Sequence, residues 1–127
     1  MKIVNLIFTC LAISISTLAN AAYIDALHPS NGSEVRSSFQ YVGRVVDLPP
    51  SRPTSVLLSI RDKETGDELV VDQFIIEDPK FREMIIERVD LPPSQKGRFV
   101  TITLTARDIE TGDELTTGTI EALVKTK

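Results

Sequence analysis

Hydrophobic and polar residues alternate along most of the chain after residue 22, and turn-forming residues separate the alternating stretches. A period of two predicts strands rather than helices, and turns at this spacing are typical of a β-sandwich or barrel. The predicted strands cover residues 23–27, 39–48, 55–62, 68–76, 84–91, 98–108 and 114–124. The predicted core consists of apolar residues on the inward faces of these strands, which are Phe39, Tyr41, Val45, Val56, Leu58, Ile60, Val100, Ile102, Leu104, Ala106, Ile120, Ala122 and Val124.

The chain contains an internal repeat built from two phrases. Residues 61–69 read Arg-Asp-Lys-Glu-Thr-Gly-Asp-Glu-Leu, and residues 107–115 differ from them only at the third position. Upstream, Val-Asp-Leu-Pro-Pro-Ser occurs at 46–51 and again at 89–94. Proline cannot donate to a strand ladder, so each Pro-Pro pair is expected to end a strand at a structural corner. Each copy therefore predicts a strand, a corner, a second strand, a Glu-Thr-Gly-Asp hairpin and a third strand.

Residues 78–91 fit two structures. Asp78 and Pro79 suit the N-cap and the first position of a helix. The same segment also alternates as a strand. Residues 85–91 precede the second Pro-Pro pair as residues 42–48 precede the first. The repeat therefore favours a strand from about residue 84, preceded at most by one helical turn.

Two repeat units and the N-terminal strand give seven strands, the number and connectivity of an immunoglobulin-like Greek-key sandwich. The sequence thus predicts an all-β fold with an internal two-fold repeat. In this fold the middle strands of the two units run antiparallel, so the two hairpins are expected at opposite ends. A three-residue insertion at 94–98 is the main difference between the units.

Several short motifs resemble those of bacterial immunoglobulin-like domains. The run Pro29-x-x-Gly32-x-x-Val35, followed by a strand containing Phe39, Val42 and Gly43, is similar to the opening of the spore-germination and lipoprotein-associated type. The segments 60–62 and 105–108 are similar in kind to strand ends of that type. The resemblance implies an immunoglobulin-like fold in a cell-envelope setting, and it supplies no catalytic residue.

Residues 1–21 are predicted to be a secretory signal peptide. Lys2 is followed by a mostly apolar run, and Ala19-Asn20-Ala21 places small residues where a signal peptidase reads, so cleavage is expected after Ala21. An uncleaved membrane anchor is the alternative, but polar residues interrupt the run and its length is marginal for spanning. Residues 22–127 then form one domain without cysteine, because Cys10 is the single cysteine.

The charge of the chain argues against two classes of partner. The formal net charge is −4, and it becomes −5 when Lys2 is removed with the signal. An acidic domain is a poor match for nucleic acid and for an anionic membrane surface. The expected product is periplasmic or secreted, with no nucleic-acid partner and no membrane insertion after cleavage.

The two hairpins carry the most suggestive clusters of polar residues. Oxygen-rich groups suit calcium, and each hairpin holds four acidic residues, namely Asp62, Glu64, Asp67 and Glu68 in the first and Asp108, Glu110, Asp113 and Glu114 in the second. The structural interpretation is a tight turn in which Gly66 and Gly112 take positive φ and the first aspartate bonds the turn backbone. The spacing matches no calcium-loop signature, which favours the turn.

No catalytic, cofactor-binding or metal-binding residue is predicted. His28 is the single histidine and is expected to be a solvated surface residue, and Tyr23 and Tyr41 are expected to be core or strand-edge residues. The sequence therefore predicts a non-catalytic module that binds a protein partner in the bacterial envelope, through the loop 29–38 or a sheet edge. The alternative is a small-ligand binder, with calcium at the hairpins or a saccharide on a sheet face.

Overall fold

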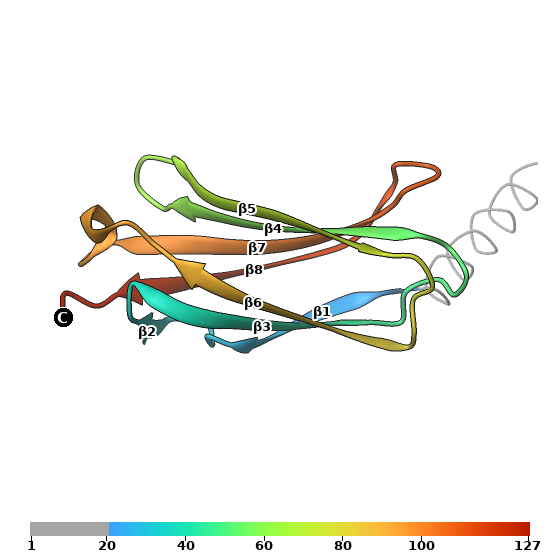
Figure 1. The fold of residues 1–127 in the computed structure, drawn as a ribbon, viewed down its shortest axis with the longest axis horizontal. Helices are drawn as coiled ribbons and strands as arrows, with labels where there is room; N and C mark the ends of the chain where they lie inside the picture. Colours follow the sequence, from blue (N-terminus) through green and yellow to red (C-terminus); the bar gives the residue numbers. More distant parts are fainter. Residues whose placement is uncertain (1–20) are drawn as a thin grey trace, which may run out of the picture.

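The structure of the protein is a computed structural model that describes residues 21–127. The predicted signal peptide lies outside these residues except for Ala21, and it stays a prediction. The described chain forms eight strands and one short 3₁₀ helix (Figure 1). They are β1 (Tyr23–His28), β2 (Ser33–Val35), β3 (Ser38–Val46), β4 (Thr54–Asp62), β5 (Glu68–Ile76), β6 (Arg82–Asp90), η1 (Pro93–Gln95), β7 (Phe99–Asp108) and β8 (Glu114–Val124). No helix within this range has the length and apolar character needed to cross a membrane.

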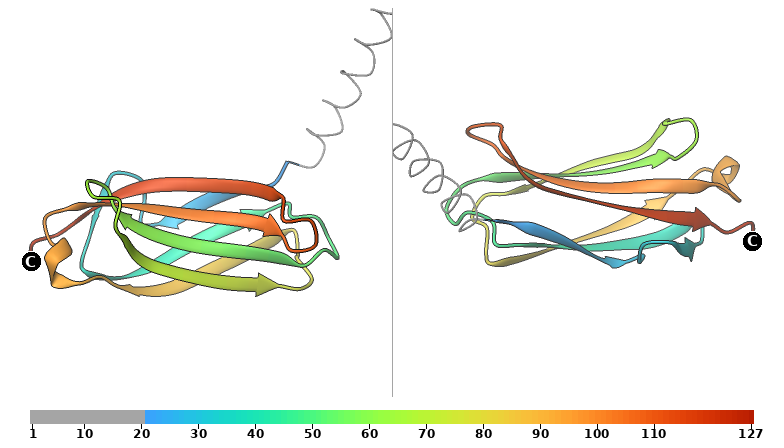
Figure 2. Two further views of the ribbon diagram at one scale, coloured as in Figure 1. Left: turned by 90° about the horizontal axis from the view of Figure 1, so that it is seen from above. Right: turned by 180° about the vertical axis from the view of Figure 1, so that it is seen from behind.

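The strands form two sheets that pack face to face, as predicted for an immunoglobulin-like sandwich (Figure 1). One sheet has the order β1-β3-β6 and the other has the order β2-β8-β7-β4-β5. The β2–β8 pairing is parallel and the others are antiparallel. Strand β1 also contacts β8 across the two sheets, where a Cβ on Gly118 would come within 3.1 Å of Ile24 Cγ2. Strands β1 and β8 thus approach each other on that side, and β5 and β6 form the edges of the opposite side (Figure 2).

The strand register confirms the internal two-fold repeat. In the repeat, Leu58 of β4 corresponds to Leu104 of β7, and these two residues are direct partners in the β4–β7 ladder. In the other sheet, the repeat relates Val42 to Ile85 and Gly43 to Ile86. In the β3–β6 ladder Val42 pairs with Ile86 and Gly43 pairs with Ile85, so the two-fold axis passes between these two adjacent pairs. Both ladders therefore place the same pseudo-two-fold axis at the middle of the sandwich.

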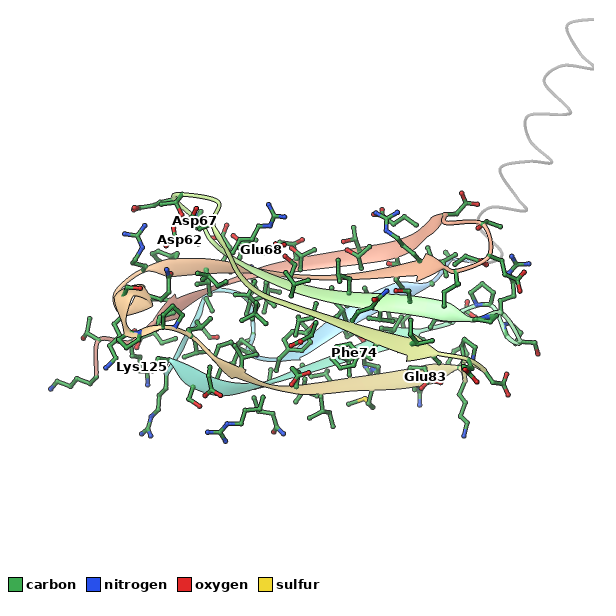
Figure 3. The ribbon with its side chains drawn as sticks, turned by 45° about the horizontal axis from the view of Figure 1, so that its top comes forward. Asp62, Asp67, Glu68, Phe74, Glu83 and Lys125 are labelled. Carbon is green, nitrogen blue, oxygen red and sulfur yellow. The ribbon has the colours of Figure 1, made fainter. Side chains whose placement is uncertain are left out.

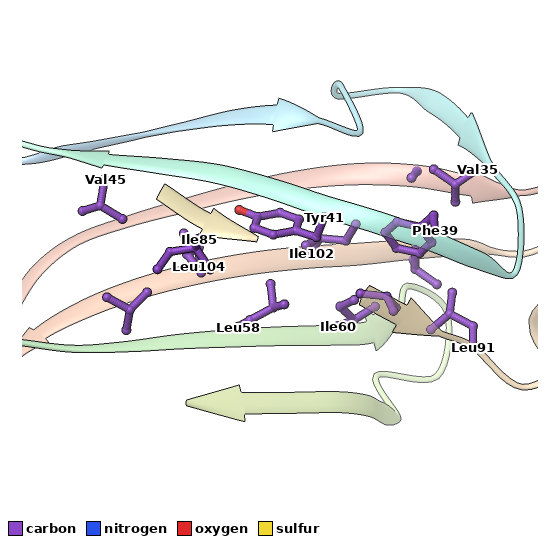
Figure 4. Packing of buried hydrophobic residues seen from close by; sticks show 14 of the residues in the cluster. Val35, Phe39, Tyr41, Val45, Leu58, Ile60, Ile85, Leu91, Ile102 and Leu104 are labelled. Atoms are coloured by element: carbon purple, nitrogen blue, oxygen red, sulfur yellow. The ribbon is translucent and has the colours of Figure 1, made fainter. Parts of the chain in front are cut away.

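The core lies between the two sheets and contains nearly all of the predicted residues (Figure 4). Ile120 is the exception, because it is only half-buried against the cluster. The Tyr41 ring is buried and covers Gly43, where an added Cβ would lie 2.5 Å from the Tyr41 hydroxyl oxygen. Burial raises the pKa of Tyr41 to about 12, because the ionised form would lose its hydration.

The structure resolves one local alternative and corrects one local expectation. The segment before β6 forms no helical turn, because the Asp47 N–H donates to the Phe81 carbonyl at 2.8 Å and this bond continues the β3–β6 pairing beyond the strand ends. The predicted loop 29–38 contains the three-residue strand β2, which raises the number of strands from seven to eight. The insertion in the second repeat unit begins in η1.

Candidate functional site

The first predicted cluster lies at the tip of the β4–β5 hairpin, where Figure 3 shows Asp62, Asp67 and Glu68 together. Asp62 Oδ1 accepts from the backbone N–H groups of Glu64 and Thr65 at 2.9 and 3.0 Å. Gly66 has a φ of 76°, and its N–H donates to the Asp62 carbonyl at 2.8 Å. This is the predicted turn, in which a carboxylate organises the backbone and glycine supplies the left-handed residue.

The second cluster lies at the tip of the β7–β8 hairpin and has the same geometry. Asp108 Oδ1 accepts from the N–H groups of Glu110 and Thr111 at 2.9 and 3.1 Å. Gly112 has a φ of 77°, and its N–H donates to the Asp108 carbonyl at 2.8 Å. Because β4 and β7 are antiparallel, the two tips lie at opposite ends of the molecule (Figure 1), and they cannot form a single site.

Each hairpin aspartate forms an ion pair with an arginine of the other repeat unit. Arg98 Nε donates to Asp62 Oδ2 at 2.5 Å, and Arg52 Nε donates to Asp108 Oδ2 at 2.6 Å. The exchange follows from the register, because the end of β4 lies beside the start of β7 and the end of β7 lies beside the start of β4. The two pairs therefore join the repeat units reciprocally at both ends of the sandwich.

These ion pairs determine the chemistry of the hairpins. The hydrogen bond from the Arg98 guanidinium lowers the pKa of Asp62, and the bond from Arg52 lowers the pKa of Asp108 to about 2. Both carboxylates are buried, and both oxygens of each carboxylate already accept hydrogen bonds. A calcium ion would have to displace the guanidinium groups. The geometry favours the structural interpretation of the hairpins over the calcium alternative.

Neither Arg52 nor Arg98 was among the residues that the sequence predicted for a site. Each arginine stands ten residues before the hairpin aspartate of its own repeat unit, which is the signal that could have drawn attention to them. The pairing itself joins residues 36 and 56 positions apart, so it depends on the sheet register.

The single histidine and the two tyrosines take the places predicted for them. His28 is exposed at the end of β1, Tyr23 is exposed at the start of the same edge strand, and Tyr41 is in the core. Within residues 21–127, no group of three or more His, Cys, Asp or Glu side chains is arranged to hold a metal ion.

Strand β5 is the best candidate for an interaction surface. It is nine residues long and, in the described chain, its backbone pairs with β4 alone. On the outer face of the sheet, Val71 and Ile75 lie on either side of Gln73, which is the partner of Leu57 on β4. We call Leu57, Val71 and Ile75 the β5 patch; all three side chains are exposed, Ile75 to 55%. An apolar patch beside an unpaired backbone edge provides both components needed to bind an added strand.

The charged residues of the segment that contains β5 are all acidic. Between Lys63 and Lys80 the chain contains no basic residue. The same interval contains six acidic residues, namely Glu64, Asp67, Glu68, Asp72, Glu77 and Asp78. Arg61 and Arg98 reach the hairpin end of the interval, at Glu68 and Glu64 respectively, and the remainder of β5 has no ion pair among the described residues.

Comparison with known proteins gives a fold but no family. No protein-family model matches the chain, and no curated protein matches it. Among solved structures, the chain is similar to a β-glucuronidase of Bacteroides uniformis, with 16% identity and a TM-score of 0.52 over 82% of this chain and 13% of that one. It is also similar to a putative β-galactosidase of Bacteroides fragilis, with 13% identity and a TM-score of 0.51 over 83% of this chain and 16% of that one.

A bacterial adhesin from Mobiluncus mulieris that contains disulfide, isopeptide and ester cross-links is similar as well. Its identity is 4% and its TM-score is 0.54, over 83% of this chain and 58% of the adhesin. The chain thus spans less than two thirds of each of these three proteins. At such low identity the likeness shows a β-sandwich fold of immunoglobulin-like type and nothing about activity.

Proposed function

We propose that the protein is an exported, non-catalytic interaction module of the bacterial cell envelope, and that an extended segment of a partner protein binds at the β5 edge. The observation that carries this proposal is the exposed backbone edge of β5 together with the β5 patch. A partner strand would extend the five-stranded sheet through main-chain hydrogen bonds, and its side chains would contact Val71 and Ile75.

The composition of β5 supports this choice of edge. Natural edge strands are usually protected by lysine, proline, bulges or charged residues that point inward. Over nine residues β5 contains no lysine and no proline, and its register shift lies near its first residue. Asp72, which pairs with the buried Leu58, is the one charged residue on its inner face. The protection of this edge is confined to Asp72 and the bulge near its start, which leaves the last part of β5 open to a partner strand.

The acidic surroundings define the chemistry of the partner. Glu68, Asp72, Glu77 and Asp78 would repel a second acidic strand, including the same strand of another copy. A segment with lysine or arginine among its apolar residues would instead be attracted, and the charges would accelerate its association. We therefore propose a partner segment that is extended, partly apolar and basic.

The test compares two matched variants. Ile75 of β5 and Ile86 of β6 are both 55% exposed on the outer faces of edge strands, in different sheets. Immobilised full-length protein, Ile75→Lys and Ile86→Lys are each used to capture cross-linked partners from envelope extracts. We expect the wild type and Ile86→Lys to retain a partner protein that Ile75→Lys loses. This binding should weaken as salt is added.

Two results would count against the proposal. If the same proteins are captured by all three baits, the β5 edge is not the contact. If the captured partner is lost only from Ile86→Lys, the contact lies on the other sheet. Folding of each variant is checked by its thermal unfolding, because a surface Ile→Lys change should leave the transition nearly unchanged.

A further inference from the structure

Strand β6 forms a second sheet edge, and the structure shows which of its residues direct their N–H and C=O groups outward. The ladder between β3 and β6 has no register shift, and the Leu91 N–H to Ser37 carbonyl and Asp47 N–H to Phe81 carbonyl bonds continue it at both ends. Antiparallel ladders alternate between bonded and non-bonded pairs, so the odd-numbered residues of β6 bond to β3. The even-numbered residues therefore direct their N–H and C=O groups away from the sheet; they are Arg82, Met84, Ile86, Arg88 and Asp90.

We propose that two copies of this chain pair through their β6 strands, antiparallel and centred on Ile86. In this register Ile86 faces Ile86 of the second copy, Met84 faces Arg88, and Arg82 faces Asp90. Every outward-directed backbone group of the strand then has a partner, and an arginine lies opposite an aspartate at both ends of the ladder. Direct cross-strand pairs of opposite charge stabilise antiparallel strands.

The order of charges along β6 favours this register over registers centred on other residues of the strand. A shift that moves the centre to Ile85 puts Arg82 opposite Arg88 of the second copy, and a shift to Arg88 puts two copies of Arg88 opposite each other. Centring the pair on Met84 or Glu87 leaves Arg82 or Asp90 without an opposite charge across the ladder. The centre at Ile86 is the one that joins Arg82 to Asp90 and opposes no like charges.

The outer face of the three-stranded sheet supports the same pairing. Val42 of β3 is the partner of Ile86, so an apolar pair lies at the β6 edge of this face. Joining two copies at Ile86 would place the two apolar pairs side by side across four strands. Asp90 is already oriented, because Ser38 Oγ donates to Asp90 Oδ1 at 2.6 Å. On the inner face, Glu83 and Glu87 would lie opposite Val89 and Ile85 of the second copy and not opposite an acid.

The test is a charge exchange, measured by sedimentation equilibrium of the purified full-length protein. Arg82→Asp places aspartate opposite Asp90 of the second copy, and Asp90→Arg places arginine opposite Arg82. Each change acts twice in a two-fold dimer, so each single variant should weaken the dimer by about tenfold or more. The double variant Arg82→Asp/Asp90→Arg restores opposite charges and should recover most of the affinity.

Ile86→Lys should abolish the dimer, and Ile75→Lys, matched in exposure on β5, should leave it intact. A chain that stays monomeric at high concentration, or a double variant no tighter than the singles, would overturn the proposal. The result is independent of partner binding at β5, because the two isoleucine variants separate the two edges.

Discussion

Replacing Gly66 with alanine should destabilise the fold by about 1 kcal/mol, and the same change at Gly112 should have the same effect. The two glycines have φ values of 76° and 77°, and no atom outside the adjoining residues lies within 4 Å of a Cβ built on either one. An added methyl group therefore meets no neighbour, and the effect is a backbone term. An L-residue in the left-handed region costs about 1–2 kcal/mol, and the lower entropy of the unfolded chain offsets about 0.4–1 kcal/mol of this.

The assay is urea unfolding of the wild type, both single variants and the double variant. With a slope of about 1.5 kcal/mol/M, each substitution should lower the midpoint by about 0.7 M. The hairpins lie at opposite ends of the sandwich, so the two effects should add in the double variant (Figure 1). Asparagine at either position should cost less than alanine, because asparagine tolerates the left-handed region.

Three results would contradict the assignment of Gly66 and Gly112 to left-handed positions in equivalent turns. If one alanine variant is neutral and the other is not, the two hairpins are not equivalent turns. If both are neutral, neither glycine needs positive φ and the turn assignment fails. If the asparagine variants are as unstable as the alanine variants, the loss arises from something other than the φ angle.

Three further predictions concern the core and the ion pairs. Arg52 lowers the pKa of Asp108 from 3.8 to about 2, so the unfolded chain binds a proton at a higher pH than the folded chain. The ion pair therefore contributes its full stabilisation above about pH 4 and loses it as the pH falls toward 2. Asp108→Asn should flatten this part of the plot of stability against pH, measured by urea titrations at pH 2–6. Leu104→Ala, at the pseudo-two-fold axis, should destabilise by about 3 kcal/mol in the same assay, since the side chain is fully buried. Gly43→Ala should cost about 1–3 kcal/mol and perturb the near-ultraviolet circular dichroism of Tyr41, because the new methyl group overlaps the ring.

The repeated phrases made most of the fold predictable. They assigned residues 84–91 to a strand against a competing helical pattern, and the structure has β6 at Arg82–Asp90. They also predicted that the two hairpins lie at opposite ends. Alternation identified the buried faces of β4 and β7, because a strand with one buried face must place every second residue inside.

The remaining features depend on contacts between distant residues. Strand β2 has three residues and pairs in parallel with β8, so its own pattern is too short to detect. The exchange of Arg52 and Arg98 between repeat units requires the β4–β7 register. The predicted hairpin places β5 beside β4, but the position of β5 as the last strand of the sheet depends on the order of all five strands. The candidate interaction surface follows from that position, whereas the sequence predicted only the loop 29–38 or an unspecified sheet edge.

The most direct test of the proposed function is hydrogen–deuterium exchange of the protein alone and with its captured partner. We expect the backbone amides of Glu68–Ile76 to gain protection in the complex, while those of the β7–β8 hairpin are unchanged. Protection that appears elsewhere, with β5 exchanging as fast in the complex as in the free protein, would contradict it.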